Sequence, residues 1–85
     1  MTLLALFPNP THQLLNIVLE APAVQQVQIV ITDIAGKIVY QQTLELAKGT
    51  NNEVMNVAGL AKGTYVVKII CADGCEGAVS KFVKQ

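Results

Sequence analysis

Few side chains of this chain could take part in catalysis. The sequence contains one histidine, His12, and one serine, Ser80. Histidine and serine can act as base and nucleophile in acyl transfer, but an acid must orient the histidine and all three must meet in the fold. No motif groups these residues with an acid, and no glycine-rich phosphate loop is present. We therefore expect no catalytic residue, and we expect His12 to be a solvated loop residue.

Two cysteines, Cys71 and Cys75, flank the segment Ala-Asp-Gly at 72–74. A zinc site needs four ligands at finger-like spacing, and two cysteines with a distant His12 fall short of it. We expect no metal and no cofactor. Across a turn of this length the two Cα atoms could lie within the ~4.4–6.8 Å that a disulfide requires. In an oxidising compartment Cys71 and Cys75 could form a disulfide, and otherwise they are two small apolar residues.

The charge balance excludes a further class of function. Six acidic residues balance six lysines, there is no arginine, and charged residues make up 14% of the chain. Nucleic-acid-binding domains carry a basic patch, often with arginines, so we expect no nucleic-acid partner. No apolar run approaches the ~18 residues of a membrane-spanning helix. The hydrophobic fraction of 52% is high enough to leave apolar surface for a protein partner.

Strands must position these residues, because apolar side chains alternate with a period of two along most of the chain. Leu15, Ile17 and Leu19 share one face of such a run. Turn signals such as Asp-Ile-Ala-Gly at 33–36 recur at short intervals, which leaves no room for crossover helices. We predict one domain, 1–85, with about seven strands, at 2–7, 14–20, 25–32, 37–46, 51–57, 64–71 and 77–84.

This pattern predicts an all-β fold, a small Ig-like or fibronectin-III-like antiparallel β-sandwich. The spacing of Leu60, Gly63 and Tyr65 matches a tyrosine corner, in which the hydroxyl group binds the backbone a few residues upstream. Near the N-terminus, Pro8 and Pro10 lack N–H groups and flank Asn9, which the second proline pushes toward an extended conformation. That segment should end one strand and lead into the next.

Taken in order, the motifs of the chain resemble those of a known family. They are FPNP at 7–10, LLNIVL at 14–19, DIAGKIV at 33–39, GTN at 49–51, VAGLAKGTYVVKI at 57–69 and KFVKQ at 81–85. This set closely resembles the type A C-terminal sorting domain of the type IX secretion system, or Por secretion system, of Bacteroidota. Cys71 and Cys75 are not part of the family pattern, and Phe7 stands where many members have tyrosine.

The resemblance implies a non-catalytic secretion signal. Such domains end large cargo proteins that cross the inner membrane by a separate Sec signal and pass through the periplasm. The outer-membrane translocon recognises the domain, and a sortase-like peptidase at the cell surface cleaves it off. The cargo is then released or joined to lipopolysaccharide. On this resemblance we expect a piece excised from a larger secreted protein, with cargo on its N-terminal side and no small-molecule substrate.

The resemblance also assigns roles to single residues. The terminal Lys81, Phe82, Val83, Lys84 and Gln85 match the segment that the family needs for translocon recognition. Phe82 is expected to pack, whereas no packing role is evident for the two lysines, which could instead guard an edge strand against pairing. Motif residues expected to be mainly structural are Pro8, Asn9, Pro10, Gly36, Leu60, Gly63 and Tyr65. The opening motif is expected to mark where the domain begins and the cargo linker ends.

A fibronectin-III-like adhesion or carbohydrate-binding module of a cell-surface protein is the alternative function. Such a module would present aromatic side chains in its loops to stack on sugars. The four aromatic residues, Phe7, Tyr40, Tyr65 and Phe82, do not cluster in any loop, which disfavours sugar binding. The open edges of a sandwich would also allow dimerisation.

Overall fold

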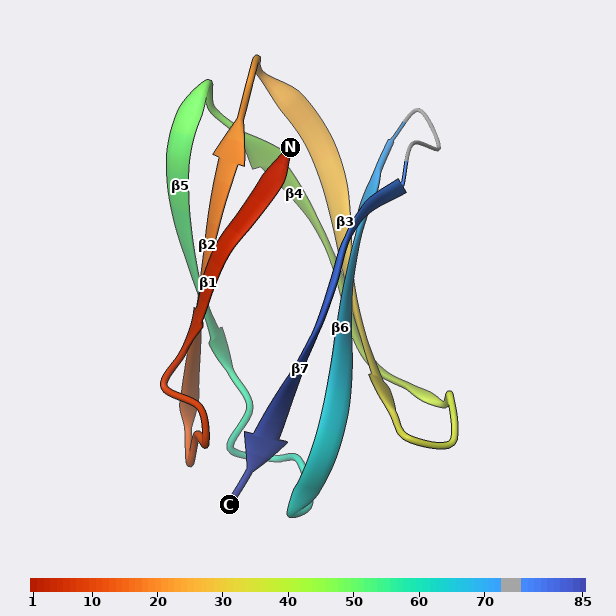
Figure 1. Cartoon of the computed structure of the whole chain (residues 1–85). Helices are drawn as coiled ribbons and strands as arrows, with labels where there is room; N and C mark the ends of the chain where they lie inside the picture. Colours follow the sequence, from red (N-terminus) through yellow and green to blue (C-terminus); the bar gives the residue numbers. More distant parts are fainter. Residues whose placement is uncertain (73–75) are drawn as a thin grey trace.

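The computed structural model describes residues 1–72 and 76–85, which form seven strands (Figure 1). No strand bound differs from its predicted position by more than two residues. Within the described residues, no helix has the length and apolar character that would be needed to cross a membrane. In chain order the strands are β1 (Thr2–Phe7), β2 (Leu14–Ala21), β3 (Gln25–Asp33), β4 (Ile38–Leu46), β5 (Gly49–Asn56), β6 (Gly63–Cys71) and β7 (Glu76–Lys84).

The strands form two sheets that face each other. The three-stranded sheet has the order β1-β2-β5, and the four-stranded sheet has the order β4-β3-β6-β7. Every neighbouring pair is antiparallel. The chain crosses from one sheet to the other after β2, after β4 and after β5, and Figure 1 shows the resulting two layers. The predicted all-β sandwich is confirmed.

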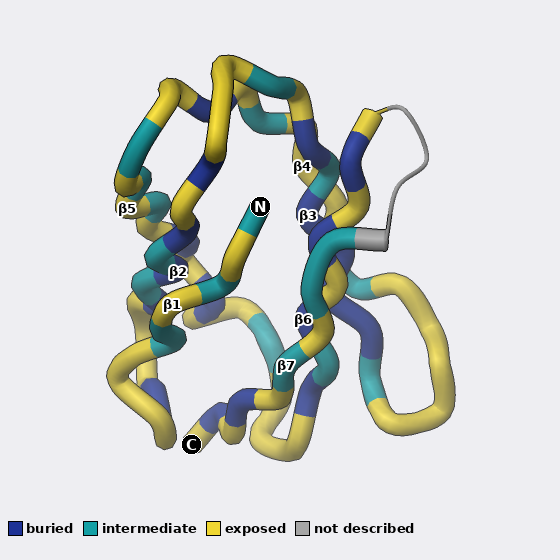
Figure 2. Tube along the Cα trace, turned by 45° about the horizontal axis from the view of Figure 1, so that its top comes forward, coloured by how far each residue is buried: buried dark blue, intermediate teal, exposed yellow. Residues whose placement is uncertain are grey.

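The alternating apolar faces of the strands meet between the two sheets and form one core. Buried residues recur along the strands of both layers, separated by exposed ones (Figure 2). The period-two pattern predicted this division, because successive side chains of a strand point to opposite faces of its sheet. Among the described residues, the apolar side chains with no exposed surface are Leu15, Ile17, Leu19, Ile29, Ile31, Leu46, Val67 and Phe82.

Turns at the ends of the strands are fixed by polar side chains. The Asp33 carboxylate accepts hydrogen bonds from the backbone N–H groups of Ala35 and Lys37, each at 2.9 Å. Gly36 follows with φ near +90°, a conformation that glycine adopts without a Cβ penalty. The Asp-x-x-Gly motif therefore closes the β3–β4 hairpin, and the position of Gly36 agrees with a structural role.

The Phe-Pro-Asn-Pro motif lies inside the domain. Residues that precede Pro8 already belong to the sandwich, since β1 pairs with β2 from Thr2 opposite Glu20 to Phe7 opposite Asn16. The expectation that this motif marks the start of the domain is therefore wrong. The apolar run before the motif supplies a full edge strand, and the motif connects this strand to β2.

Candidate functional site: the terminal strand and the segment that covers its edge

The terminal residues 81–85 continue β7 and contribute to the core. Phe82 lies opposite Tyr65 on β6 and has no exposed surface. The two rings stack with their centroids 5.5 Å apart and their planes inclined by 21°. Aromatic pairs in this arrangement stabilise a fold beyond the area that they bury. The terminal segment is thus a structural part of the sandwich.

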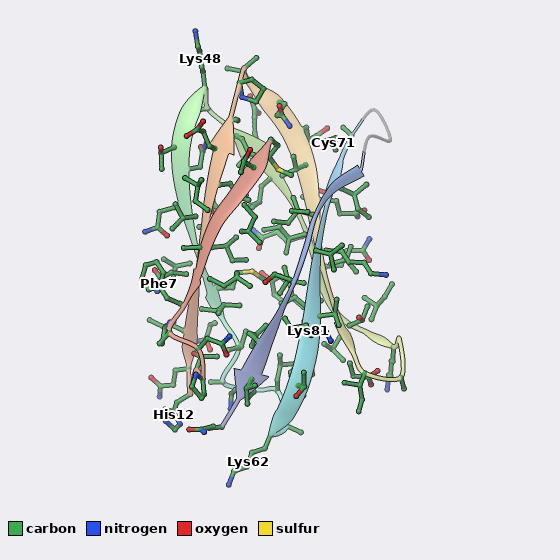
Figure 3. The ribbon with its side chains drawn as sticks, viewed as in Figure 1. Phe7, His12, Lys48, Lys62, Cys71 and Lys81 are labelled. Atoms are coloured by element: carbon green, nitrogen blue, oxygen red, sulfur yellow. The ribbon has the colours of Figure 1, made fainter. Side chains whose placement is uncertain are left out.

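The opposite face of the same strand is open to solvent. Val79, Lys81 and Val83 form an outward row along β7, with Val79 59% exposed and Val83 38% exposed. Lys81 lies over the β6–β7 part of the sheet in Figure 3. On β6, Val66 lies opposite Lys81 and Lys68 lies opposite Val79. The row therefore combines two apolar side chains with the Lys81 ammonium group, and Lys68 on β6 adds a second ammonium group to the same surface.

The two terminal lysines differ sharply in exposure. Lys84 shares the inward face with Phe82 and is only 7% exposed, whereas Lys81 is exposed. The Lys84 ammonium group donates a hydrogen bond to the backbone oxygen of Gln85 at 3.2 Å. Burial of its aliphatic stem with a satisfied ammonium group is a packing role that the sequence did not indicate. Of the residues predicted for recognition, Lys81, Val83 and Gln85 are exposed, and Phe82 and Lys84 are buried.

The free edge of β7 is covered at its end by residues 9–11, which we call the edge clamp. The backbone N–H of Val83 donates to Asn9 Oδ1 at 3.0 Å, and Asn9 Nδ2 donates to the Lys81 carbonyl oxygen at 3.5 Å. The Thr11 N–H donates to the Val83 carbonyl oxygen, and the Gln85 N–H donates to the Thr11 carbonyl oxygen, both at 2.9 Å. The opening motif and the terminal segment are therefore in direct contact.

The prolines explain why a side chain takes part in this edge pairing. Neither Pro8 nor Pro10 has an N–H to offer to a neighbouring strand. The side-chain amide of Asn9, which lies between the two prolines, carries both a donor and an acceptor, as a peptide group does. It bonds to the edge of β7 as the backbone of a neighbouring strand would. The peptide bonds preceding both prolines are cis. Thr11 anchors the end of the clamp, because it has no exposed surface and its hydroxyl donates to the Leu14 carbonyl oxygen.

A tyrosine corner supports the terminal strand from its other side. The Tyr65 hydroxyl donates to the Ala61 carbonyl oxygen at 2.6 Å, which is the bond that the spacing of Leu60, Gly63 and Tyr65 predicts. Leu60 is partly buried against the core, and Gly63 lies opposite Lys84. The corner residues and the edge clamp therefore lie on either side of the end of β7.

A family model described as a secretion system C-terminal sorting domain matches residues 5–85, which include the edge clamp and the whole of β7. The chain belongs to this family. Its members are C-terminal sorting domains for type IX secretion, the tails of cargo proteins exported to the cell surface or the extracellular space. Domains of this kind are generally non-catalytic. A comparison with curated proteins gave no match.

The residues of the sorting domain that could do chemistry are dispersed. His12 is exposed beside the edge clamp, and Cys71 is buried at the opposite end of the sandwich (Figure 3). The Gln25 side-chain amide donates to the Cys71 sulfur at 3.8 Å. Among the described residues, no three His, Cys, Asp or Glu side chains gather closely enough to hold a metal ion. Cys75 lies outside the described residues, so the Cys71–Cys75 disulfide stays a prediction.

The aromatic side chains of the sorting domain do not form a platform for sugars. Tyr65 and Phe82 are buried against each other, and Tyr40 is partly buried with its hydroxyl bonded to Gln42. Phe7 is exposed on the outer side of the three-stranded sheet (Figure 3). A single exposed ring on a sheet face gives no support to the alternative of a carbohydrate-binding module.

Sequence reasoning missed the contact between the two ends of the chain. It identified Asn9 and the terminal segment separately and did not single out Thr11. The signal in the sequence is slight, because a bond from a side-chain amide to a backbone 72 or 74 residues away leaves no spacing to detect. The available sign is an asparagine between two prolines, because neither proline can donate to a neighbouring strand whereas the asparagine side chain both donates and accepts.

Proposed function

We propose that this sorting domain is a non-catalytic signal that directs an N-terminal cargo protein through the outer-membrane translocon of the type IX system. The cargo would reach the periplasm by its own Sec signal, and the chain would be one domain at the C-terminal end of that larger protein. The family match over residues 5–85 supports this function. The observation that carries it in the structure is the division of the terminal segment into a buried face and an exposed face.

The exposed side chains of the terminal segment are the proposed contact with the translocon. Lys81, Val83 and Gln85 would bind it, while Phe82 and Lys84 would support them by packing. A receptor could add a strand to an edge or dock on side chains. The edge of β7 at residues 81–85 is already paired with the edge clamp, which favours docking on the outward row. An apolar receptor surface with acidic groups would complement this row.

Removal of the domain by a sortase-like peptidase is the second part of the proposal. A peptidase needs an extended, unpaired segment in its cleft, and β1 is already paired with β2 from Thr2 onward. Cleavage is therefore expected on the N-terminal side of β1. The cargo would then be released or joined to lipopolysaccharide at the cell surface. Mass spectrometry of the exported cargo would identify the bond, and a cargo that keeps the sorting domain would contradict cleavage.

The function is tested by fusing the domain to the C-terminus of a Sec-exported reporter. In a host with the type IX system, the reporter should reach the cell surface only when it carries the domain. The same reporter without the domain should stay in the periplasm and serves as the control. If the fusion stays in the periplasm like the control, the domain is not a sufficient secretion signal and the proposal is overturned.

Substitutions on the outward row test which residues the translocon contacts. Lys81→Glu reverses an exposed charge without touching the core, and we expect it to lower the surface fraction of the reporter several-fold. Lys48→Glu is the matched control, because Lys48 is also exposed but lies at the far end of the sandwich (Figure 3). Equal export of the two variants would exclude Lys81 from the contact.

A further inference from the structure

Asn9 bonds to the terminal segment through its side chain and lies on the edge of the strand rather than in the outward row. We propose that Asn9 is a positioning residue of the sorting signal, which holds residues 81–85 in the sheet so that Lys81 and Val83 face the receptor. This role rests on the proposed function, and Asn9 would act through the terminal segment without contacting the translocon itself.

The end of β7 is paired along one edge by β6 and along its other edge by the edge clamp. On one side, β6 pairs with it up to Gly63 opposite Lys84. On the other side, the Val83 N–H and the Lys81 carbonyl oxygen are bonded to Asn9 and to no strand. Terminal residues of a domain fray unless they are tied down. Without the Asn9 side chain, the Val83 N–H and the Lys81 carbonyl oxygen would have no partner at the edge, and this part of β7 would be held there only by β6.

The chemistry of the Asn9 amide allows its two bonds to be tested separately. Alanine removes both the acceptor for Val83 and the donor for Lys81. Aspartate keeps an acceptor for the Val83 N–H, which makes the shorter bond at 3.0 Å. It replaces the donor of the 3.5 Å bond by a carboxylate oxygen that faces the Lys81 carbonyl oxygen. The bonds of Thr11 to the strand use its backbone and persist in both variants. Asn9→Asp should therefore retain most of the Val83 protection and of the export that Asn9→Ala loses.

Amide hydrogen exchange of the 85-residue chain measures the positioning directly. In Asn9→Ala, exchange of the Val83 amide should accelerate on the order of tenfold, the effect expected when its one hydrogen bond to the Asn9 side chain is lost. Core amides should be unchanged, and Asn9→Asp should keep Val83 protected. Asn16→Ala is the matched control, because the Asn16 amide donates to the Phe7 carbonyl oxygen at 3.2 Å at the start of the same connection without touching β7.

Export of the reporter fusion then links the position of the segment to its function. Asn9→Ala should lower the surface fraction several-fold, while Asn9→Asp and Asn16→Ala should export like the unchanged domain. Faster Val83 exchange with undiminished export would overturn the positioning role and leave the proposed function standing. Unchanged Val83 exchange in Asn9→Ala would also overturn it. If the unchanged domain does not export the reporter, the proposed function falls, and the role of Asn9 in export falls with it.

Discussion

Replacing Phe82 by alanine would show how far the terminal segment belongs to the core. Phe82 has 0% of its surface exposed and stacks on Tyr65. Truncating a buried phenylalanine to alanine costs about 3–5 kcal/mol, through lost burial and the cavity that remains. A chain of 85 residues has a free energy of unfolding of only about 4–13 kcal/mol at the usual value per residue. Phe82→Ala should therefore remove a large share of the stability.

Urea denaturation followed by circular dichroism measures this loss. With a slope of about 1.5 kcal/mol per molar urea, the midpoint should fall by about 2–3 M. Val83→Ala is the control, because it shortens the next side chain on the exposed face and should cost less than about 1 kcal/mol. Similar small losses in both variants would refute the buried assignment of the terminal segment.

Deleting the terminal segment would change the core and the exposed face together. Removing residues 81–85 removes Phe82 from the core together with the side chains proposed for recognition. A failure of export after such a deletion would not separate lost recognition from an unfolded domain. Substitution of Lys81 changes the exposed face alone, so it is the sharper test of the recognition surface.

Three further substitutions test the local geometry, each by urea or thermal denaturation. Gly77→Ala should cost about 3 kcal/mol, because a Cβ there would lie 2.1 Å from the Ile69 carbonyl oxygen; a loss below about 1 kcal/mol would show that the backbone adapts. Gly36→Ala should cost about 1–2 kcal/mol from its φ of +90° alone, since no atom lies within 4 Å, and it should cost less than Gly77→Ala. Tyr65→Phe loses only the bond to Ala61 and should cost about 1 kcal/mol, or ~4–8 °C in Tm; an unchanged Tm would contradict a stabilising corner.

The strands and their inward faces could be predicted from the sequence because they follow from local pattern. Alternation places Leu15, Ile17 and Leu19 in the core, and the structure buries all three. The segment that became β4 also suited a helix by residue propensity. Its Leu44 and Leu46 alternate with polar residues, and the strand interpretation proved right. The spacing of Leu60, Gly63 and Tyr65 likewise predicts the hydrogen bond from the Tyr65 hydroxyl to the Ala61 carbonyl oxygen.

The arrangement of the terminal segment could not be predicted in the same way. Lysines are almost never fully buried unless paired, so the sequence indicates a recognition role for Lys84 and no packing role. Lys84 follows Phe82 by two residues, and this spacing places both side chains on the inward face of the strand. The bonds of Asn9 to β7 depend on how two sheets bring the ends of the chain together, which no local spacing encodes. The close approach of Gly77 to the Ile69 carbonyl group lies next to a register shift between β6 and β7, and neither has a local signature in the sequence.

The central claim is that the type IX translocon recognises this domain as an export address. It is tested most directly by measuring the surface fraction of the reporter fusion in two isogenic hosts, one with the translocon and one in which it is inactivated. We predict surface reporter in the first host and accumulation in the periplasm in the second. Equal surface fractions in the two hosts would contradict the claim.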